Sequence, residues 1–382
     1  GDIWVGYFGS GKINRFDGQR WTPLQLRSMG GSDDGTALIA TQDGALWIGG
    51  GGRALKSYRN GKWYFYDTSS LSLPTTRIFD MLISTDKALW LVYRGQEAVR
   101  FDYSEDRWST FEGLHFQCET SDGMQWFLSK DDGIVRRDPS RQTWTRYDTE
   151  DGLMDKPNQL FMTRTGTLWA AGSHNDVATI ALFTGQTWAL QKHPQIGKDI
   201  DIRSGVCESE NGTLWIAGRR SDDLQVGVLK LTGQTAEYIS PPKVTTIIYG
   251  IGQSSDGTLW FGGESLSHYD GKTWASSSKS PELSNLQDWI DAIYTTSDRN
   301  LWLGTRSYGA IQYDGNTWTR YDTRQGLADS RIIDIFQTTD GSIWISTDNG
   351  ISRFDGQTWL TQALHPDLAK EIQKKGVGQT QD

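Results

Sequence analysis

The chain has 382 residues, of which 18 are Trp, 43 are Gly and only 9 are Pro, and 36% are hydrophobic. This composition excludes a disordered or collagen-like chain and favours β-sheets joined by tight turns. No apolar run approaches the roughly 20 residues of a membrane span, and the first residues lack a signal-peptide pattern. The net charge of −9 argues against nucleic acid or an anionic membrane as the main partner.

A short strand that carries a Trp recurs nine times along the chain. The Trp follows Leu or Ile in all copies except one, where Gln125 precedes it, and a polar turn such as Asp340-Gly341 comes before the strand. A second Trp follows 14 to 19 residues later in eight of the copies. The first Trp residues of the nine copies are Trp4, Trp47, Trp90, Trp126, Trp169, Trp215, Trp260, Trp302 and Trp344.

Each repeat of about 43 residues contains four strand-like stretches. A further apolar stretch such as 332–336 precedes the Trp strand, and an alternating strand such as 350–354 lies between the two Trp. Four consecutive antiparallel strands form one blade of a β-propeller, so we expect an all-β propeller fold. Seventeen of the 18 Trp are expected to pack between blades, while Trp289 falls outside the pattern.

The two ends of the chain suggest how the propeller closes. Residues 376–382 followed by 1–6 closely resemble residues 250–262, and the first repeat begins directly at its Trp strand. We therefore expect residues 1–382 to form a single propeller domain of nine four-stranded blades. Residues 376–382 would supply the inner strand of the first blade and remove exposed sheet edges. The alternative is a ring of eight blades with a spare repeat.

The segments Tyr321–Leu327, Thr339–Thr347 and Gly350–Gly356 resemble the two-component regulator propeller repeats. The resemblance extends along the whole chain and implies an extracytoplasmic propeller, of the kind found in the sensor half of hybrid histidine kinases and in secreted or periplasmic proteins. It therefore implies a periplasmic or extracellular location. The sequence contains no kinase or DNA-binding region. The repeat residues of the family are structural, so the resemblance identifies no binding or catalytic residue.

Motifs for catalysis are sparse in this sequence. Residues 6–12 nearly match a phosphate-binding loop, but Ile13 stands where Ser or Thr must bind magnesium. The five His are scattered without metal-site spacing. We expect no catalytic residue, no metal and no cofactor. Carboxylates on or near inner strands offer a weaker alternative as cation ligands, and they are Asp80, Glu119, Glu208, Asp291 and Asp334.

Cys118 and Cys207 each lie eight residues before the Trp of their repeat. They therefore occupy equivalent inner-strand positions in blades that are separated by a whole blade. Cα atoms so far apart exceed the roughly 7 Å limit for a disulfide. The sequence predicts two free thiols, buried as small apolar residues.

The long connections between strands are expected to share one face of the propeller, the top, where a rigid ring carries variable loops. Basic residues recur there and would attract anions to the mouth of the channel. The linker between Trp108 and Trp126 is the shortest, so we expect a notch beside Arg94 and Lys130 where an anionic ligand enters. The alternative is that these cations are solvated or paired with Asp131, Asp132, Asp222 and Asp223. The expected ligand-binding residues are Arg77, Arg94, Lys130, Lys156, Arg203, Arg219, Trp289, Arg306 and Arg331.

The first functional hypothesis is a non-enzymatic propeller, monomeric, that binds or senses a small molecule, an oligosaccharide or a protein partner. The second is a propeller lyase or hydrolase with its site in the central channel, and a purely structural scaffold is a third. A metal held by His and carboxylates would favour the enzyme, whereas a metal-free mouth lined by aromatic and charged residues would favour the binding protein.

Overall fold

The computed structural model describes most of the chain in segments. They are residues 3–6, 12–17, 21–25, 35–41, 45–50, 54–59, 62–67, 71, 73–74, 78–93, 97–103, 105–163, 165–196, 206–209, 211–219, 226–233, 235–239, 248–276, 283, 286, 288–338 and 340–363. Strands dominate these segments, and two short 3-10 helices, η1 (Thr149–Asp151) and η2 (Pro194–Ile196), occur between them. None of the described helices is long and apolar enough to cross a membrane.

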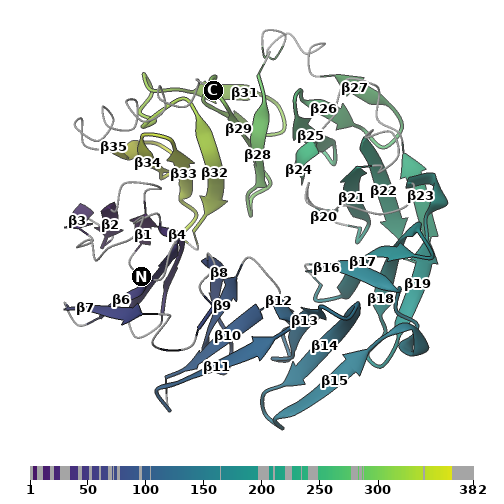
Figure 1. Ribbon diagram of the computed structural model, residues 1–382. Helices are drawn as coiled ribbons and strands as arrows, with labels where there is room; N and C mark the ends of the chain where they lie inside the picture. Colours follow the sequence, from purple (N-terminus) through teal and green to yellow (C-terminus); the bar gives the residue numbers. More distant parts are fainter. Residues whose placement is uncertain are drawn as a thin grey trace, which may run out of the picture. The chain divides into compact units, whose positions relative to one another are not determined.

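The chain divides into two compact units. Unit 1 comprises residues 1–175 and 179–192, and unit 2 comprises residues 176–178 and 193–382. Within a sheet, each strand pairs antiparallel with the next one in the sequence, as the ribbon shows (Figure 1). This arrangement follows from the short polar turns, which leave no room for a crossover.

Unit 1 begins with a sheet of three strands, which are β1 (Ile3–Gly6), β2 (Lys12–Phe16) and β3 (Trp21–Gln25). The next two sheets contain β4 (Gly35–Ala40), β5 (Leu46–Gly50), β6 (Ala54–Arg59) and β7 (Lys62–Asp67), then β8 (Ile78–Ile83), β9 (Leu89–Tyr93), β10 (Glu97–Asp102) and β11 (Arg107–Glu112). The last two contain β12 (Leu114–Glu119), β13 (Gln125–Ser129), β14 (Gly133–Asp138) and β15 (Thr143–Tyr147), then β16 (Lys156–Met162), β17 (Leu168–His174), β18 (Val177–Phe183) and β19 (Trp188–Lys192).

Unit 2 contains four sheets of four strands. The first two contain β20 (Val206–Glu208), β21 (Leu214–Arg219), β22 (Val226–Thr232) and β23 (Thr235–Ile239), then β24 (Ile248–Gln253), β25 (Leu259–Gly263), β26 (Ser267–Tyr269) and β27 (Trp274–Ser276). The last two contain β28 (Ile290–Thr295), β29 (Leu301–Thr305), β30 (Ala310–Tyr313) and β31 (Trp318–Tyr321), then β32 (Ile332–Gln337), β33 (Ile343–Thr347), β34 (Gly350–Phe354) and β35 (Trp359–Ala363).

The expectation of nine four-stranded blades is wrong. The described residues form eight four-stranded blades and a three-stranded sheet, β1–β2–β3, that lacks an inner strand. Residues 376–382, which were expected to supply that strand, lie outside the described residues. The expectation came from the similarity of residues 376–382 and 1–6 to residues 250–262. Sequence similarity predicts the local conformation of a segment, but it does not predict which distant strand that segment pairs with. That residues 1–382 form a single domain stays a prediction.

The first Trp of each four-stranded blade is buried, at most 5% exposed, as predicted, whereas Trp144, a second Trp, is 41% exposed, and the side chains of Trp4 and Trp21 lie outside the described residues. Trp302, for example, packs against Phe354 and Trp359 of the following blade, with ring centroids 5.9 and 6.4 Å apart. Burying each indole between two blades removes a large apolar area from water, which stabilises a sheet that cannot cover both of its own faces.

Candidate functional site

Each blade has two distinct edges. At the hairpin edge, a tight turn such as residues 254–258 joins the first strand to the second, and its backbone hydrogen bonds recur from blade to blade. At the opposite edge, which we call the loop edge, the first strand begins and the second strand ends. The turns between the third and fourth strands lie at the hairpin edge too, as expected for the Asp-Gly-type turns. The connections from the second to the third strand, expected to be long, are short in several blades, such as residues 175–176 and 348–349.

The first strands carry a β-bulge near the loop edge. In six of them the register of pairing shifts at the same level, so that one residue is left out of the ladder. A bulge of this kind re-aims a side chain without ending the strand. The residues left out of the ladder are Thr36, Phe79, Asn158, Tyr249, Asp291 and Ile333.

Two bulge residues of unit 2 meet Trp289 and Arg306 at the loop edge. Trp289 directly precedes β28, Arg306 directly follows β29, and the backbone N–H of Arg306 donates to the Trp289 carbonyl oxygen over 3.1 Å. The Arg306 guanidinium carbon lies 4.2 Å from the centre of the Trp289 ring. The Tyr249 ring, in turn, lies 5.9 Å from the Trp289 ring at an interplanar angle of 36°. We call these three residues, together with Asp291, the Trp289 platform.

Asp291 fixes the direction of the Arg306 side chain. Its two carboxylate oxygens accept from Nε of Arg306 at 3.1 and 2.8 Å. The hydrogen bond to Asp291 raises the pKa of Arg306, so the guanidinium stays charged. Asp291 accepts from Nε and not from the two terminal Nη groups. These Nη groups can donate two parallel hydrogen bonds to a carboxylate.

A neighbouring carboxylate holds the loop after Arg306. Oδ2 of Asp288 accepts from the backbone N–H groups of Ser307 and Tyr308 at 2.6 and 2.9 Å, and from the Ser307 hydroxyl at 2.9 Å. The backbone N–H of Trp289 donates to Oδ1 of the same carboxylate. The platform therefore stands on backbone that is fixed before any ligand arrives, which lowers the entropy lost on binding.

The platform faces solvent with both apolar and charged surface. Tyr249 is 41% exposed, the Arg306 side chain is 39% exposed, and Trp289 is half-buried. Aromatic faces offer dispersion contacts to a flat or apolar ligand, and the guanidinium offers charge-assisted hydrogen bonds. The arrangement suits binding, and none of its groups is placed as a nucleophile beside a general base.

The other expected binding residues that the structure describes do not join the Trp289 platform. Lys130 and Lys156 are exposed, and Arg331 is exposed and paired with Asp348 over 3.1 Å. Lys130 packs its stem over Gly113, in the short linker between β11 and β12, and stays a predicted binding residue. The structure thus brings together only Trp289 and Arg306 of the expected residues that it describes with side chains. Arg77, Arg94, Arg203 and the Arg219 side chain lie outside the described residues.

The carboxylates that were considered as cation ligands each have at least one protein contact, Glu208 included, although Oε2 of Glu119 is buried without a described partner. Asp80 and Asp334 each accept from the backbone N–H of the following residue, and Glu119 accepts from that of Thr85. Asp291 is the partner of Arg306. Within the described segments, no three His, Cys, Asp or Glu side chains gather in a way that would hold a metal ion.

Both cysteines are free, as predicted from their spacing. They are half-buried and pair with Trp126 and Trp215 at equivalent ladder positions. Burial raises the pKa of the Cys118 thiol to about 12 and that of the Cys207 thiol to about 11. Neither thiol is therefore a reactive thiolate at neutral pH.

Tyr249 is the platform residue that the sequence reasoning missed. A signal for it exists, because all six bulge residues lie 11 positions before the first Trp of their repeat. Alignment of the repeats on that Trp places Tyr249, Asp291 and Ile333 at one level in three successive blades. That a bulge occurs there, rather than regular pairing, is not visible in the pattern.

Comparison with known proteins supports the fold and the resemblance of the repeats. Residues 326–349 match the family model of the two component regulator propeller. No curated protein sequence matches the chain. These 24 residues contain the whole of Thr339–Thr347 and the end of Tyr321–Leu327, two of the segments that suggested the family.

Solved structures that resemble the chain share its fold at low sequence identity. The Dos1 propeller is 13% identical over 89% of this chain and 88% of its own, with a TM-score of 0.50. Virginiamycin B lyase from Staphylococcus aureus is 14% identical over 71% of this chain and 91% of its own, with a TM-score of 0.45.

The extracellular domain of the hybrid two component system BT3049 from B. thetaiotaomicron is 16% identical over 96% of this chain, with a TM-score of 0.37. The chain spans 57% of the length of that domain. The chain is thus an all-β propeller whose repeats resemble those of the two component regulator propeller family.

Proposed function

We propose that this protein is a non-enzymatic binding or sensing module that holds a ligand on the Trp289 platform. The observation that carries the proposal is the Arg306 guanidinium 4.2 Å over the Trp289 ring, beside the exposed Tyr249 ring. Adjacent aromatic rings at a surface offer a ligand more contact area than a single exposed ring does, and a fixed guanidinium beside them adds specificity.

The favoured ligand is a molecule with a flat, weakly polar face and a carboxylate. An acidic oligosaccharide meets both requirements, because sugar rings stack on indole and phenol rings while the carboxylate accepts from the Arg306 Nη groups. The sensing role and a periplasmic or extracellular location rest on the family resemblance. Arg331, in the following blade of unit 2, would add a general attraction for anions, and Lys130 and Lys156 stay predicted anion-binding residues of unit 1.

The proposal is tested by calorimetric titration of trigalacturonate and of its uncharged counterpart galactotriose. We expect the acidic sugar to bind the wild type more tightly, and Arg306→Ala to remove that preference. Trp289→Ala is expected to weaken both sugars by about tenfold, because one aromatic contact is worth on the order of 1 kcal/mol. Arg107→Ala serves as the control, because Arg107 is an exposed arginine in unit 1.

Two results would contradict the proposal. One is an affinity in Trp289→Ala that equals the wild-type value. The other is an equal loss in Arg107→Ala and Arg306→Ala, which would mean that the sugar responds to total charge and not to the platform.

A further inference from the structure

A second candidate site lies in unit 1 and shares no residue with the platform. A cavity of about 590 Å³ lies between the blade β4–β7 and the blade β8–β11. This volume is typical of pockets that hold small organic molecules. The cavity is at the hairpin edge, where β4 ends and the turn after β8 begins. Its described lining residues are Ala40, Thr41, Ile83, Ser84, Thr85, Lys87 and Tyr103.

The apolar walls of the cavity are held by the core. The Tyr103 ring packs against Trp47 and Phe101, with ring centroids 6.0 and 4.9 Å apart. Ile83 and Tyr103 both pack against the buried cluster that fills the space between these two blades. Because the core fixes these side chains, the pocket exists before a ligand binds.

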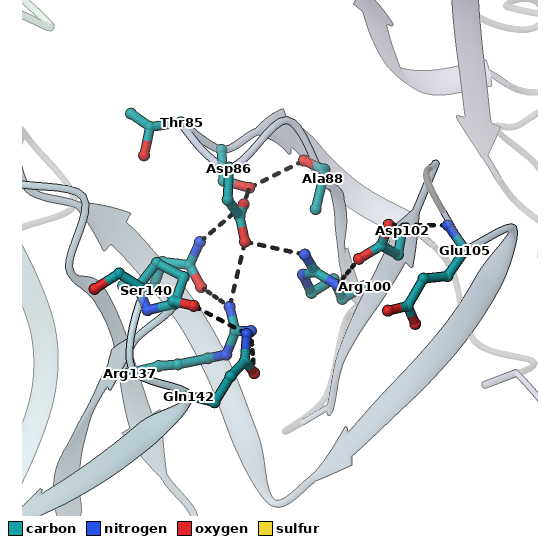
Figure 2. A network of polar contacts seen from close by, with 12 residues as sticks. Thr85, Asp86, Ala88, Arg100, Asp102, Glu105, Arg137, Ser140 and Gln142 are labelled. Carbon is teal, nitrogen blue, oxygen red and sulfur yellow. Dashed lines mark hydrogen bonds and ion pairs between the residues drawn. The ribbon is translucent and has the colours of Figure 1, made fainter.

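Most polar groups around the cavity are already used by the protein. The Thr41 hydroxyl donates to the Ala45 carbonyl oxygen at 3.0 Å, and the Ser84 hydroxyl bonds to Asp86 and to the Ala88 carbonyl oxygen. Figure 2 shows that the Asp86 carboxylate points toward Arg100 and Arg137, which lie 3.0 and 3.5 Å from it. Its negative charge is therefore balanced by two guanidinium groups and does not set the charge of the cavity.

The polar side-chain groups of Lys87 and Thr85 differ from those of Thr41, Ser84 and Asp86 in their hydrogen bonding. Lys87 and Thr85 are both exposed, and within the segments that the structure describes no hydrogen bond or ion pair involves the Lys87 ammonium or the Thr85 hydroxyl, although the Thr85 backbone N–H donates to Oε1 of Glu119. Glu119 is not among the described lining residues. The cavity therefore has apolar walls and, at its solvent-exposed side, a hydroxyl and a positive charge that no described protein group engages.

The backbone at Lys87 also marks this turn as unusual. Lys87 has φ 60°, in the left-handed region that a residue with a side chain adopts at a cost. The same turn position in other blades is occupied by glycine, at Gly123, Gly166, Gly212, Gly257 and Gly341, each with positive φ. Arg299 is the other exception, with φ 67°. A strained lysine where glycine fits better is a reason to look for a function of its ammonium group.

We propose that this cavity binds a small amphipathic anion. Its apolar body would lie against Ala40, Ile83 and Tyr103, and its carboxylate or sulfonate would pair with the Lys87 ammonium and accept from the Thr85 hydroxyl. The binding is reversible and involves no covalent step. This proposal is independent of the Trp289 platform, because it rests on different residues in the other unit.

The test uses the fluorescent probe 1-anilinonaphthalene-8-sulfonate, which combines an apolar body with a sulfonate, and the competitors 3-phenylpropionate and 3-phenylpropanol. We expect the probe to bind the wild type, and 3-phenylpropionate to displace it at lower concentration than the alcohol. Lys87→Gly is expected to raise the Kd of the probe by at least about fivefold, because a charge-assisted contact is lost. The same variant should have a higher Tm, because glycine relieves the strained backbone.

Matched variants separate the site from general effects. Arg299→Gly changes the same turn position in another blade and should leave the Kd within twofold of wild type. Ile83→Trp fills the cavity and should abolish binding of the probe. If Lys87→Gly proves less stable than wild type, Lys87→Gln, which keeps the side-chain stem, should still show the weaker binding.

Three results would overturn the proposal. They are a wild type that does not bind the probe, a Kd in Lys87→Gly and Lys87→Gln within twofold of wild type, and binding that persists unchanged in Ile83→Trp. The last result would place the probe elsewhere on the surface.

Discussion

Two arginine clusters, one in each unit, use the same chemistry in opposite surroundings. In unit 1, the Arg137 guanidinium carbon lies 6.0 Å from the Trp90 ring centre, and Nη1 is 3.5 Å from the Asp86 carboxylate. In unit 2, Arg306 lies over Trp289 and pairs with Asp291. The Arg137 side chain is 5% exposed, whereas that of Arg306 is 39% exposed.

The difference in burial changes what each arginine can do. Burial, together with the nearby charge of Arg100, lowers the pKa of Arg137, whereas the hydrogen bond to Asp291 raises that of Arg306. Arg137 donates to Gln125 and Gln142 in its own blade at 2.7 and 3.2 Å and reaches Asp86 in the preceding one. The buried cluster joins two blades (Figure 2). The exposed cluster has solvent-accessible surface that a ligand could contact.

The largest expected effect is that of Arg137→Ala on stability. The substitution leaves Oε1 of the buried Gln125 without its donor and removes one of the two arginines that pair with Asp86, while Arg100 remains. Breaking a buried polar network of this kind costs about 3 kcal/mol. Urea denaturation should show this loss in the free energy of unfolding. Arg141→Ala is the control, because that side chain is 81% exposed, and its effect should stay within about 0.5 kcal/mol. Equal stability of the two variants would mean that the buried cluster does not join the blades.

Asp86→Asn keeps the shape of the side chain but removes its charge. We expect it to lower the free energy of unfolding by about 2 kcal/mol at neutral pH, less than Arg137→Ala. Burial raises the pKa of Asp86, but the hydrogen bond from Ser84 and the charges of Arg100 and Arg137 outweigh it, so the net pKa is lowered. Stability from a lowered pKa is present above the unfolded value and is lost as the pH falls. The difference in the free energy of unfolding between Asp86→Asn and wild type should therefore become smaller in acid. A difference that is the same at pH 7 and in strong acid would refute this role for the Asp86 charge.

Two exposed turns at the hairpin edge should also stabilise the fold less as the pH falls, and this loss should be smaller than the one at Asp86. Backbone N–H groups of Thr273 and Lys272 donate to Asp270 and lower its pKa to about 2, and those of Thr358 and Gln357 do the same for Asp355. Both carboxylates have a usual value of 3.8, so their contribution should be complete above pH 4 and fade toward pH 2. Carboxyl carbon NMR titration would measure both values, and midpoints near 4 would contradict the turn geometry.

The smallest expected effect on stability is that of Arg306→Ala. An exposed ion pair contributes about 0 to 1 kcal/mol, so the free energy of unfolding should change by less than about 1 kcal/mol. Circular dichroism in a urea series would measure it. A loss as large as that of Arg137→Ala would show that the platform arginine has a structural role, and it would remove the contrast between the clusters.

The sequence predicted the fold better than the site, for physical reasons. The recurring Trp and turn residues are local signals, and they specify four antiparallel strands per repeat and a buried indole. The count of nine four-stranded blades failed at the sheet β1–β2–β3, because its expected fourth strand had to come from the other end of the chain, and a repeat pattern contains no information on such long-range contacts. Trp289 and Arg306 were both named beforehand, one because it broke the repeat and the other because cations recur at its position. Their contact depends on where β28 begins and β29 ends, and the role of Tyr249 depends on a bulge, which is a property of backbone pairing.

The shared bulge has a consequence for how such a chain can be altered. A residue that is left out of the ladder contributes no pairing specificity, so its identity can change while the neighbouring strands keep their register. The six positions, from Thr36 to Ile333, form a set of interchangeable sites on a constant frame. Randomising Tyr249, Asp291 and Ile333 together would produce a library of surfaces on one scaffold, in which new recognition properties are selected without redesigning the core.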